Sequence, residues 1–307
     1  MGVLLYTHDA CLRHDTGPGH PERAARLEAV LAALAAPRFA GLDRRQAPAA
    51  SLDQIALVHP RDWAERLLAA APRAGYVALD ADTVMSPASG EAALRAAGAV
   101  CAGVDAVIAG EGARAFCAVR PPGHHAGPRR AMGFCLFNNV AIAAAHALRA
   151  HGLMRVAIAD FDVHHGNGTQ AAFYAEARVL YGSSHQMPLY PGTGAASETG
   201  VGNIVNMPLD PGSGGTEFRA AWRHSFLPRL EAFHPELILV SAGFDAHRDD
   251  PLAALELDED DFAWITAELV RVAEHSCAGR VVSTLEGGYD LDALAASTAA
   301  HVGALGA

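Results

Sequence analysis

The sequence has few cysteines, and none is placed to suggest a disulfide framework. The 307 residues include five cysteines, and no Cys-x-x-Cys pair occurs. Their number is odd and their spacing is wide: Cys11, Cys101, Cys117, Cys135 and Cys277. This pattern indicates reduced thiols in a reducing compartment, and we expect a cytoplasmic protein.

Positive charge is also scarce. Lys and Arg number 23 against 34 Asp and Glu, so the formal net charge is -11. Because no basic patch is available to pair with phosphates, nucleic acid is not expected as a partner. An acidic surface attracts cationic substrates in general, although charge alone identifies none of them.

Long apolar runs without charge are absent as well. The N-terminal residues 1–6 have no basic region and no long apolar run, so they predict a first strand and not a signal peptide. The longest apolar helical stretches contain Arg or Glu, so no membrane span is expected. No linker rich in Pro, Ser or Gly divides the chain, and we therefore expect one domain over residues 1–307.

What the sequence does contain is an alternation of apolar runs and helical patterns. Apolar residues make up 51% of the chain, which is enough for a sizeable core. Strands are predicted at 3–6, 114–119, 155–159, 179–181, 203–207, 236–240 and 280–285, and the main helices at 22–36, 61–71, 90–110, 140–151, 217–233, 258–275 and 291–302. Such alternation predicts an α/β fold with a mostly parallel sheet and helices on both faces.

The polar cluster after the strand at 155–159 is the most informative stretch. Because side chains alternate along a strand, we expect Asp160, Asp162 and His164 to point to one face. Two carboxylates and an imidazole are costly to bury together unless a cation lies among them. Oxygen and nitrogen ligands without sulfur suit zinc, manganese or iron.

Three other predicted strands end in polar, glycine-containing turns. They carry His124 and His125, Asp245, and Tyr289. The carboxyl ends of parallel strands lie on one edge of a sheet, so these groups can converge with the cluster at 160–164. Asp162, His164 and Asp245 would give three zinc ligands with one position open for water and a substrate carbonyl. A histidine as general base and Tyr289 as oxyanion donor would complete the parts needed for amide hydrolysis.

These turns resemble the motifs of the zinc-dependent histone deacetylase family, in the right order along nearly the whole chain. The matching stretches are His20-Pro-Glu-Arg, Arg120-Pro-Pro-Gly-His-His-Ala, Asp160-Phe-Asp-Val-His-His-Gly-Asn-Gly-Thr, Ser241-Ala-Gly-Phe-Asp and Glu286-Gly-Gly-Tyr. The first motif and Asn167 resemble the class II branch and its bacterial deacetylase-like amidohydrolases, whereas class I members usually have an aspartate at the position of Asn167.

The resemblance implies an arginase-like fold with a central eight-stranded parallel sheet. It also implies one zinc ion per chain on Asp162, His164 and Asp245. His124 and His125 would be the catalytic pair, with His125 as the general base and acid. Asp160 would hold His124, Asn167 would face His125, and Tyr289 would bind the oxyanion.

The family likeness extends to the substrate tunnel and to a second cation. By resemblance, the substrate-binding positions are Gly133, Phe134, Tyr190, Leu252 and Arg26. Phe134 and Tyr190 would wall a narrow tunnel, and Arg26 matches an arginine near the exit channel for acetate. The family also binds structural potassium, here near Asp160, Asp162, His164, Ser183 and Ser184, and its members often form homo-oligomers.

The substrate is expected to be an acylated amine, most simply acetyl-lysine in a peptide. The polyamine-selective branch tends to have a glutamate where Leu252 stands, so Leu252 favours acyl-lysine. An acetylpolyamine amidohydrolase stays open, because the rim acids Asp15, Asp80 and Asp82 could meet a distal ammonium. A silent acyl-lysine-binding protein is a further alternative, whereas a di-manganese ureohydrolase has too few bridging carboxylates here.

Overall fold

The computed structural model describes residues 2–307. Its core is one eight-stranded sheet in the order β2-β1-β5-β10-β9-β6-β7-β8, and every neighbouring pair is parallel. The strands are β1 Val3–Thr7, β2 Asp43–Gln46, β5 Arg114–Cys117, β6 Val156–Asp160, β7 Val179–Gln186, β8 Ile204–Leu209, β9 Leu237–Ala242 and β10 Val281–Leu285. A separate two-stranded ribbon pairs β3 (Val77–Ala78) with β4 (Val84–Met85). The predicted α/β class and parallel sheet are confirmed.

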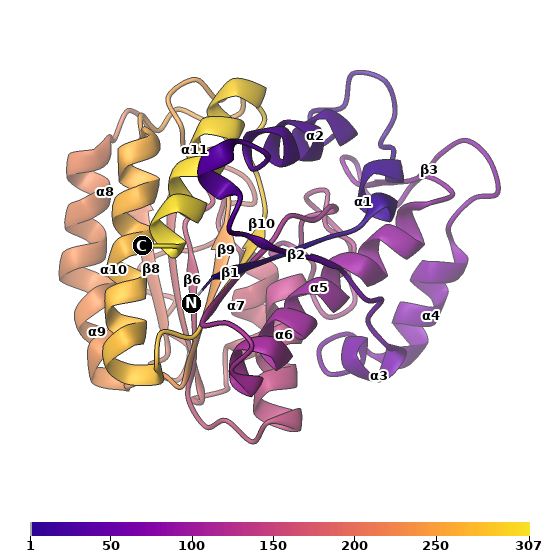
Figure 1. Ribbon diagram of the computed structural model, residues 1–307. Helices are drawn as coiled ribbons and strands as arrows, with labels where there is room; N and C mark the ends of the chain where they lie inside the picture. The colour runs from indigo at the N-terminus through magenta and orange to yellow at the C-terminus, as the bar shows by residue number, and fades with distance from the viewer. Residues whose placement is uncertain (1) are drawn as a thin grey trace.

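Helices cover both faces of the sheet (Figure 1). The longer ones are α2 Ala24–Ala33, α4 Arg61–Ala69, α5 Ser89–Ala109, α6 Asn139–Ala150, α10 Glu259–Cys277 and α11 Leu291–Leu305. The shorter ones are α1 Asp9–Arg13, α3 Leu52–Ile55, α7 Asn167–Phe173, α8 Gly215–Ala221 and α9 Leu227–Phe233, with a 3-10 turn at Pro37–Phe39 and a π-helical turn at Trp222–Phe226. In Figure 1, α5 and α6 lie on one side of the sheet, and α10 and α11 lie on the other.

The middle of the sheet is apolar because helices cover both of its faces. Strands β5, β6, β9 and β10 are buried along their whole length. Parallel strands with helices on both faces need mostly apolar side chains on both faces, which explains the predominance of Val, Ile, Leu and Ala in β6, β9 and β10. These four strands are also neighbours in the order β5-β10-β9-β6, so their carboxyl ends lie side by side.

Two of the differences between the predicted and the observed elements concern strands. Strand β6 ends at Asp160, so Asp162 and His164 lie in the following turn and not on an extended strand. They meet because the turn folds back, and strand alternation is not the reason. The edge strand β2 was not predicted, because its sequence Asp-Arg-Arg-Gln is polar and has no alternating apolar pattern.

Helix α5 is long and apolar enough to cross a membrane by length and composition alone. It carries Glu91 and Arg95 within its sequence. In the structure, 67% of its apolar window is buried, as in the core helix of a folded domain.

Candidate active site

The predicted metal ligands come together in a buried cluster. Nδ1 of His164 lies 3.1 Å from Oδ1 of Asp162 and 3.1 Å from Oδ2 of Asp245. All three residues are buried, and one ligand atom of each lies within 4.8 Å of the others. Asp162 and His164 come from the turn after β6, and Asp245 from the turn after β9. Three oxygen and nitrogen ligands this close fit a zinc ion with a fourth position open.

The charge of the cluster also fits a cation. Burial works to lower the pKa of His164, but hydrogen bonds to Asp162 and Asp245 raise it to about 10. Burial, followed by the neighbouring Asp162, raises the pKa of Asp245. Two buried carboxylates carry more negative charge than one protonated His164 can balance. A divalent cation balances that charge better than one proton.

The glycines beside the cluster are required by space. A Cβ at Gly287 would collide with the carboxylates of Asp245 and Asp162, and a Cβ at Gly243 would collide with Asp162. The Gly287 N–H donates a 2.8 Å hydrogen bond to Oδ2 of Asp162. The Gly-containing turns after β9 and β10 thus let the backbone approach the ligands and hold one of them.

His124 is held by a carboxylate behind it. Its Nδ1 lies 3.1 Å from Oδ2 of Asp160, which also accepts a 3.0 Å hydrogen bond from the Tyr181 hydroxyl. Burial opposes protonation of His124, but Asp162 and then Asp160 outweigh it and raise its pKa to about 10. Burial also raises the pKa of Asp160. His124 is therefore placed to carry positive charge in the site.

His125 has the opposite electrostatic environment. Its Nδ1 lies 2.8 Å from the amide oxygen of Asn167, so Nδ1 carries the proton and Nε2 is free to accept one. Burial, then the neighbouring His124 and His164, hold the pKa of His125 well below its ordinary value. The two adjacent imidazoles, with ring centroids 4.0 Å apart, are thus pushed toward different protonation states.

A cavity of about 270 Å³ opens above these groups. His124, His125, His164 and Tyr289 lie at its base or wall, and the predicted tunnel residues also line it. The complete lining is Asp82, Pro122, His124, His125, Gly133, Phe134, His164, Leu189, Tyr190, Leu252, Gly287 and Tyr289. The structure therefore brings the predicted histidines, Tyr289 and the predicted positions 133, 134, 190 and 252 to one cavity.

The wall formed by Gly133 and Phe134 has an unusual backbone. Both residues have positive φ angles, 57° and 67°. A Cβ at Gly133 would run into the His125 ring, so glycine is needed there. The Gly133 N–H donates to Oδ1 of Asp82 at 3.1 Å, and the Phe134 N–H donates to the Thr83 hydroxyl at 3.0 Å. These contacts from the β3–β4 ribbon hold a conformation that a phenylalanine rarely adopts.

Arg26 does not line the cavity, in contrast to its prediction as a substrate-binding residue. Its guanidinium is fully buried and donates to the carbonyls of Glu286, at 2.6 Å, and of Gly288. It also lies 4.8 Å from the centre of the Tyr289 ring. Arg26 therefore holds the turn that carries Tyr289 and contacts that side chain from behind.

Several buried residues that hold the site have no assigned role in the sequence prediction. Glu286 accepts hydrogen bonds from the backbone N–H groups of Gly123, at 2.6 Å, and His124, at 3.2 Å. Glu22 pairs with both Arg120 and Arg26 at zero exposure. Glu286, Glu22 and Arg120 stand in the matching motifs, which indicated that they matter to the site. The sequence did not show that Glu22 pairs with Arg120, 98 residues away, because the fold determines that contact.

The predicted potassium and rim residues have the following partners. Ser183 pairs with Asp160 in the register of β6 and β7, and Ser184 accepts a 3.1 Å hydrogen bond from the Trp222 indole. Of the three acids predicted at the rim, Asp82 lines the cavity, whereas Asp15 bonds to Tyr76 and Asp80 pairs with Arg130.

Comparison with known proteins gives one consistent family. The family model described as the histone deacetylase domain matches residues 20–305. Histone deacetylase 14, chloroplastic, of Arabidopsis thaliana is 40% identical over 96% of this chain and 75% of its own length. The histone deacetylase-like amidohydrolase of Pseudomonas aeruginosa is 41% identical over 94% of this chain and 81% of its own. The crystal structure of the HDA15 HD domain superposes with a TM-score of 0.94 at 36% identity, covering 99% of this chain and 88% of that one. The chain belongs to the histone deacetylase family.

Proposed function

We propose that this hydrolase of the histone deacetylase family cleaves the amide of an acylated amine, with acetyl-lysine in a peptide as the preferred class of substrate. The observation that carries the proposal is the arrangement of His125, His124 and Tyr289 around one cavity above three converging metal ligands. Metal-assisted amide hydrolysis uses a general base, a cationic partner, a hydroxyl donor and a metal site.

Zinc is the proposed metal, held by Asp162, His164 and Asp245. When bound, it would polarise the substrate carbonyl and lower the pKa of the attacking water. Potassium is proposed as a structural ion behind the site, near Asp160 and Ser183. The protein is further proposed to be cytoplasmic, because its cysteines are few and widely spaced, and to form homo-oligomers, as the family resemblance suggests.

The protein's own groups would then move the protons. Nε2 of His125, free because Nδ1 faces Asn167, accepts a proton from the attacking water and delivers it to the leaving amine nitrogen. His124, kept cationic by Asp160 and Asp162, stabilises the negative charge that develops in the transition state. Burial raises the pKa of Tyr289 well above its ordinary value, so its hydroxyl stays neutral and can donate to the oxyanion.

The shape of the cavity supports a linear, largely apolar acyl-amine. Phe134, Tyr190, Leu189 and Leu252 supply its walls. A methylene chain with an amide at its inner end fits such a channel, because the walls offer apolar contact and the polar groups gather at the base. An acetyl-lysine side chain has this form.

An acetylpolyamine amidohydrolase is the second candidate, and one residue favours it. Asp82 is the carboxylate among the cavity-lining residues that the structure describes, and it could meet a distal ammonium. Its Oδ1 already accepts hydrogen bonds from the Gly133 N–H and the Thr83 hydroxyl, which leaves less of its hydrogen-bonding capacity for a ligand. Leu252, which also lines the cavity, has no charge to offer such an ammonium.

The deciding experiment is steady-state turnover of zinc-loaded protein on acetyl-lysine peptide, longer acyl-lysine peptides, acetylputrescine and acetylspermidine, with Asp245→Ala beside the wild type. Fastest turnover of an acyl-lysine, lost in the variant, supports the proposal. Preference for an acetylpolyamine keeps the chemistry and overturns the substrate class. Tight binding of acetyl-lysine without turnover would instead indicate a binding protein.

A further inference from the structure

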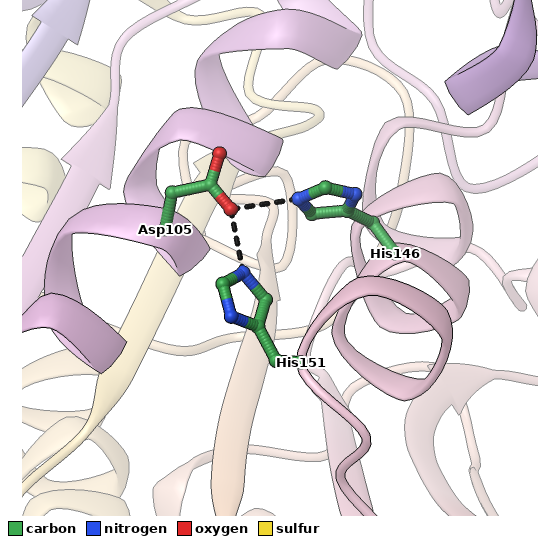
Figure 2. A group of neighbouring side chains, drawn as sticks. All are labelled: Asp105, His146 and His151. Carbon is green, nitrogen blue, oxygen red and sulfur yellow. Dashed lines mark hydrogen bonds and ion pairs between the residues drawn. The ribbon is translucent and has the colours of Figure 1, made fainter.

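Three side chains of the types that ligate metal ions meet at the surface, away from the active site. Asp105 lies on α5, His146 lies on α6, and His151 is the residue that ends α6 (Figure 2). Nε2 of His146 and Nε2 of His151 each lie 2.7 Å from the same oxygen, Oδ1 of Asp105. The two imidazole rings are 5.5 Å apart and nearly perpendicular, at 88°.

The cluster is at the opposite end of α6 from the catalytic groups. Asn138 caps the start of α6 beside the loop of His124 and His125, and its side chain donates to the Ala126 carbonyl at 3.2 Å. His151 follows Asn138 by 13 residues, roughly 20 Å along a helix. A ligand at the cluster therefore cannot share residues with the active site.

Two imidazole nitrogens, Nε2 of His146 and Nε2 of His151, point at one carboxylate oxygen of Asp105. The carboxylate only accepts, so each Nε2 must carry a proton in the metal-free form. Burial works to raise the pKa of Asp105, but the hydrogen bonds from His146 and His151 lower it below its ordinary value. The carboxylate is thus ionised at neutral pH, and a metal ion can replace the two protons between the three groups.

The geometry suits one small ion. The three ligand atoms lie within 4.8 Å of one another, and about 2 Å from each to a common centre is the normal distance for zinc. The side chains are partly exposed, by 50% for Asp105, 12% for His146 and 24% for His151, so solvent can reach the fourth position. The C-terminal end of α6 also favours a cation, because the helix dipole is negative there.

We propose that Asp105, His146 and His151 form a second metal site, which binds one divalent transition-metal ion and clamps the end of α6 to α5. Two imidazoles and one carboxylate select Zn²⁺, Cu²⁺, Ni²⁺ or Co²⁺ over Mg²⁺ and Ca²⁺, which require mostly oxygen ligands. The ion stabilises the packing of two helices on the sheet and takes no part in hydrolysis.

Metal stoichiometry in an active-site variant isolates this second site. Asp245→Ala removes a ligand from the catalytic cluster, and one equivalent of zinc should still bind in a competition titration with a chromophoric chelator. Adding His146→Ala and His151→Ala to that variant should abolish binding of this one equivalent of zinc. His275→Ala, which removes an exposed histidine on α10, is the matched control and should leave it unchanged.

A stability measurement gives the second readout. Zinc in large excess over its Kd should raise the Tm of Asp245→Ala by roughly 3 °C, as binding to the folded state alone requires. This rise should disappear in Asp105→Asn, the milder variant of the cluster, and persist in His275→Ala. The EPR spectrum of Cu²⁺-loaded Asp245→Ala should show coupling to imidazole nitrogens. Asp245→Ala that also carries His146→Ala and His151→Ala should lack this coupling.

Two results would overturn the proposal. One is a metal content of zero in Asp245→Ala under saturating zinc, and the other is equal binding with and without His146 and His151. Turnover of acetyl-lysine peptide by His146→Ala/His151→Ala should equal that of the wild type. Metal content therefore tests the second metal site, and turnover tests the proposed hydrolase function, so either can fail without the other.

Discussion

The backbone N–H of Tyr289 donates a 2.7 Å hydrogen bond to Oδ2 of Asp250. The other carboxylate oxygen, Oδ1, accepts a 3.0 Å hydrogen bond from the Leu252 N–H. One buried aspartate thus holds the backbone of two cavity-lining residues, which follow the neighbouring strands β9 and β10. Burial, then the neighbouring Asp245, raise the pKa of Asp250 to about 7.

Replacing Asp250 should misplace Tyr289. In Asp250→Asn one acceptor oxygen becomes an NH₂ group, so a donor faces one of the two backbone N–H groups. We expect kcat to fall about 10- to 100-fold, because a small misplacement of a catalytic group costs this much. Asp249→Asn, at the exposed neighbouring position, is the control and should keep wild-type kcat. Equal kcat in both variants would show that Asp250 does not position Tyr289.

The Tyr289 hydroxyl itself should act on the chemical step. Tyr289→Phe keeps the ring against Arg26 and Phe134 and removes only the donor. Loss of one oxyanion donor predicts a fall in kcat of about 10²- to 10³-fold with little change in KM. Steady-state kinetics on acetyl-lysine peptide measures both constants. Tyr174→Phe, at an exposed tyrosine, should behave as wild type, and a change confined to KM would assign Tyr289 to substrate binding instead.

Leu252 should influence the choice between lysine and polyamine substrates. A glutamate at this cavity-lining position would place a negative charge where a distal ammonium can approach. Leu252→Glu should shift the ratio of kcat/KM for acetylspermidine over acetyl-lysine peptide upward by about 10-fold, which corresponds to about 1.4 kcal/mol. Leu252→Gln has nearly the same shape without charge. If the glutamine variant shifts the ratio equally, shape and not charge determines the preference.

The pH dependence of stability should reveal a buried neutral histidine. His301 lies between the hydroxyls of Thr266, at 2.6 Å, and Ser283, at 2.8 Å, and burial lowers its pKa to about 3. An unfolded histidine has a pKa of about 6.5, so between these values the unfolded state binds the extra proton. The unfolding free energy therefore falls as pH falls below about 6.5, and His301 contributes about 1.4 kcal/mol of loss by pH 5.5.

Urea denaturation of His301→Gln and wild type at pH 7.5 and pH 5.5, with chelator present, tests this effect. The glutamine does not titrate, so the stability gap between the two proteins should narrow by about 1.4 kcal/mol at the lower pH. His275→Gln, at an exposed site, should show the same gap from wild type at both values. A constant gap for His301→Gln would mean that His301 takes up its proton at the same pH in the folded and the unfolded protein.

The central motifs were predictable from sequence because they are local. Apolar runs that end in polar, glycine-containing turns marked β5, β6, β9 and β10, and the carboxyl-edge rule placed their turns together. The geometry of Asp162 and His164 was not predictable in the same way. Strand alternation was the wrong reason for their meeting, because the chain turns directly after Asp160 and a backbone fold-back depends on packing around it.

Asp250 and Asp105 show what sequence patterns leave out. Asp250 stands in an ordinary polar run, and its role depends on where the turn of Tyr289 passes. Asp105 lies 41 residues before His146, on a different helix, and no spacing rule connects them. Both relationships are set by the packing of elements that are distant along the chain.

By itself, the sequence determined the fold class, the family and the residue types at the catalytic centre, since periodicity and turn chemistry are encoded over a few neighbouring residues. Only the tertiary structure decided that Arg26 holds the Tyr289 turn from behind, that Asp82 and Thr83 support a strained Phe134, and that Glu22 pairs with Arg120. These contacts join segments far apart in the chain, and their partners are chosen by the order of strands in the sheet and by the space that remains between packed side chains.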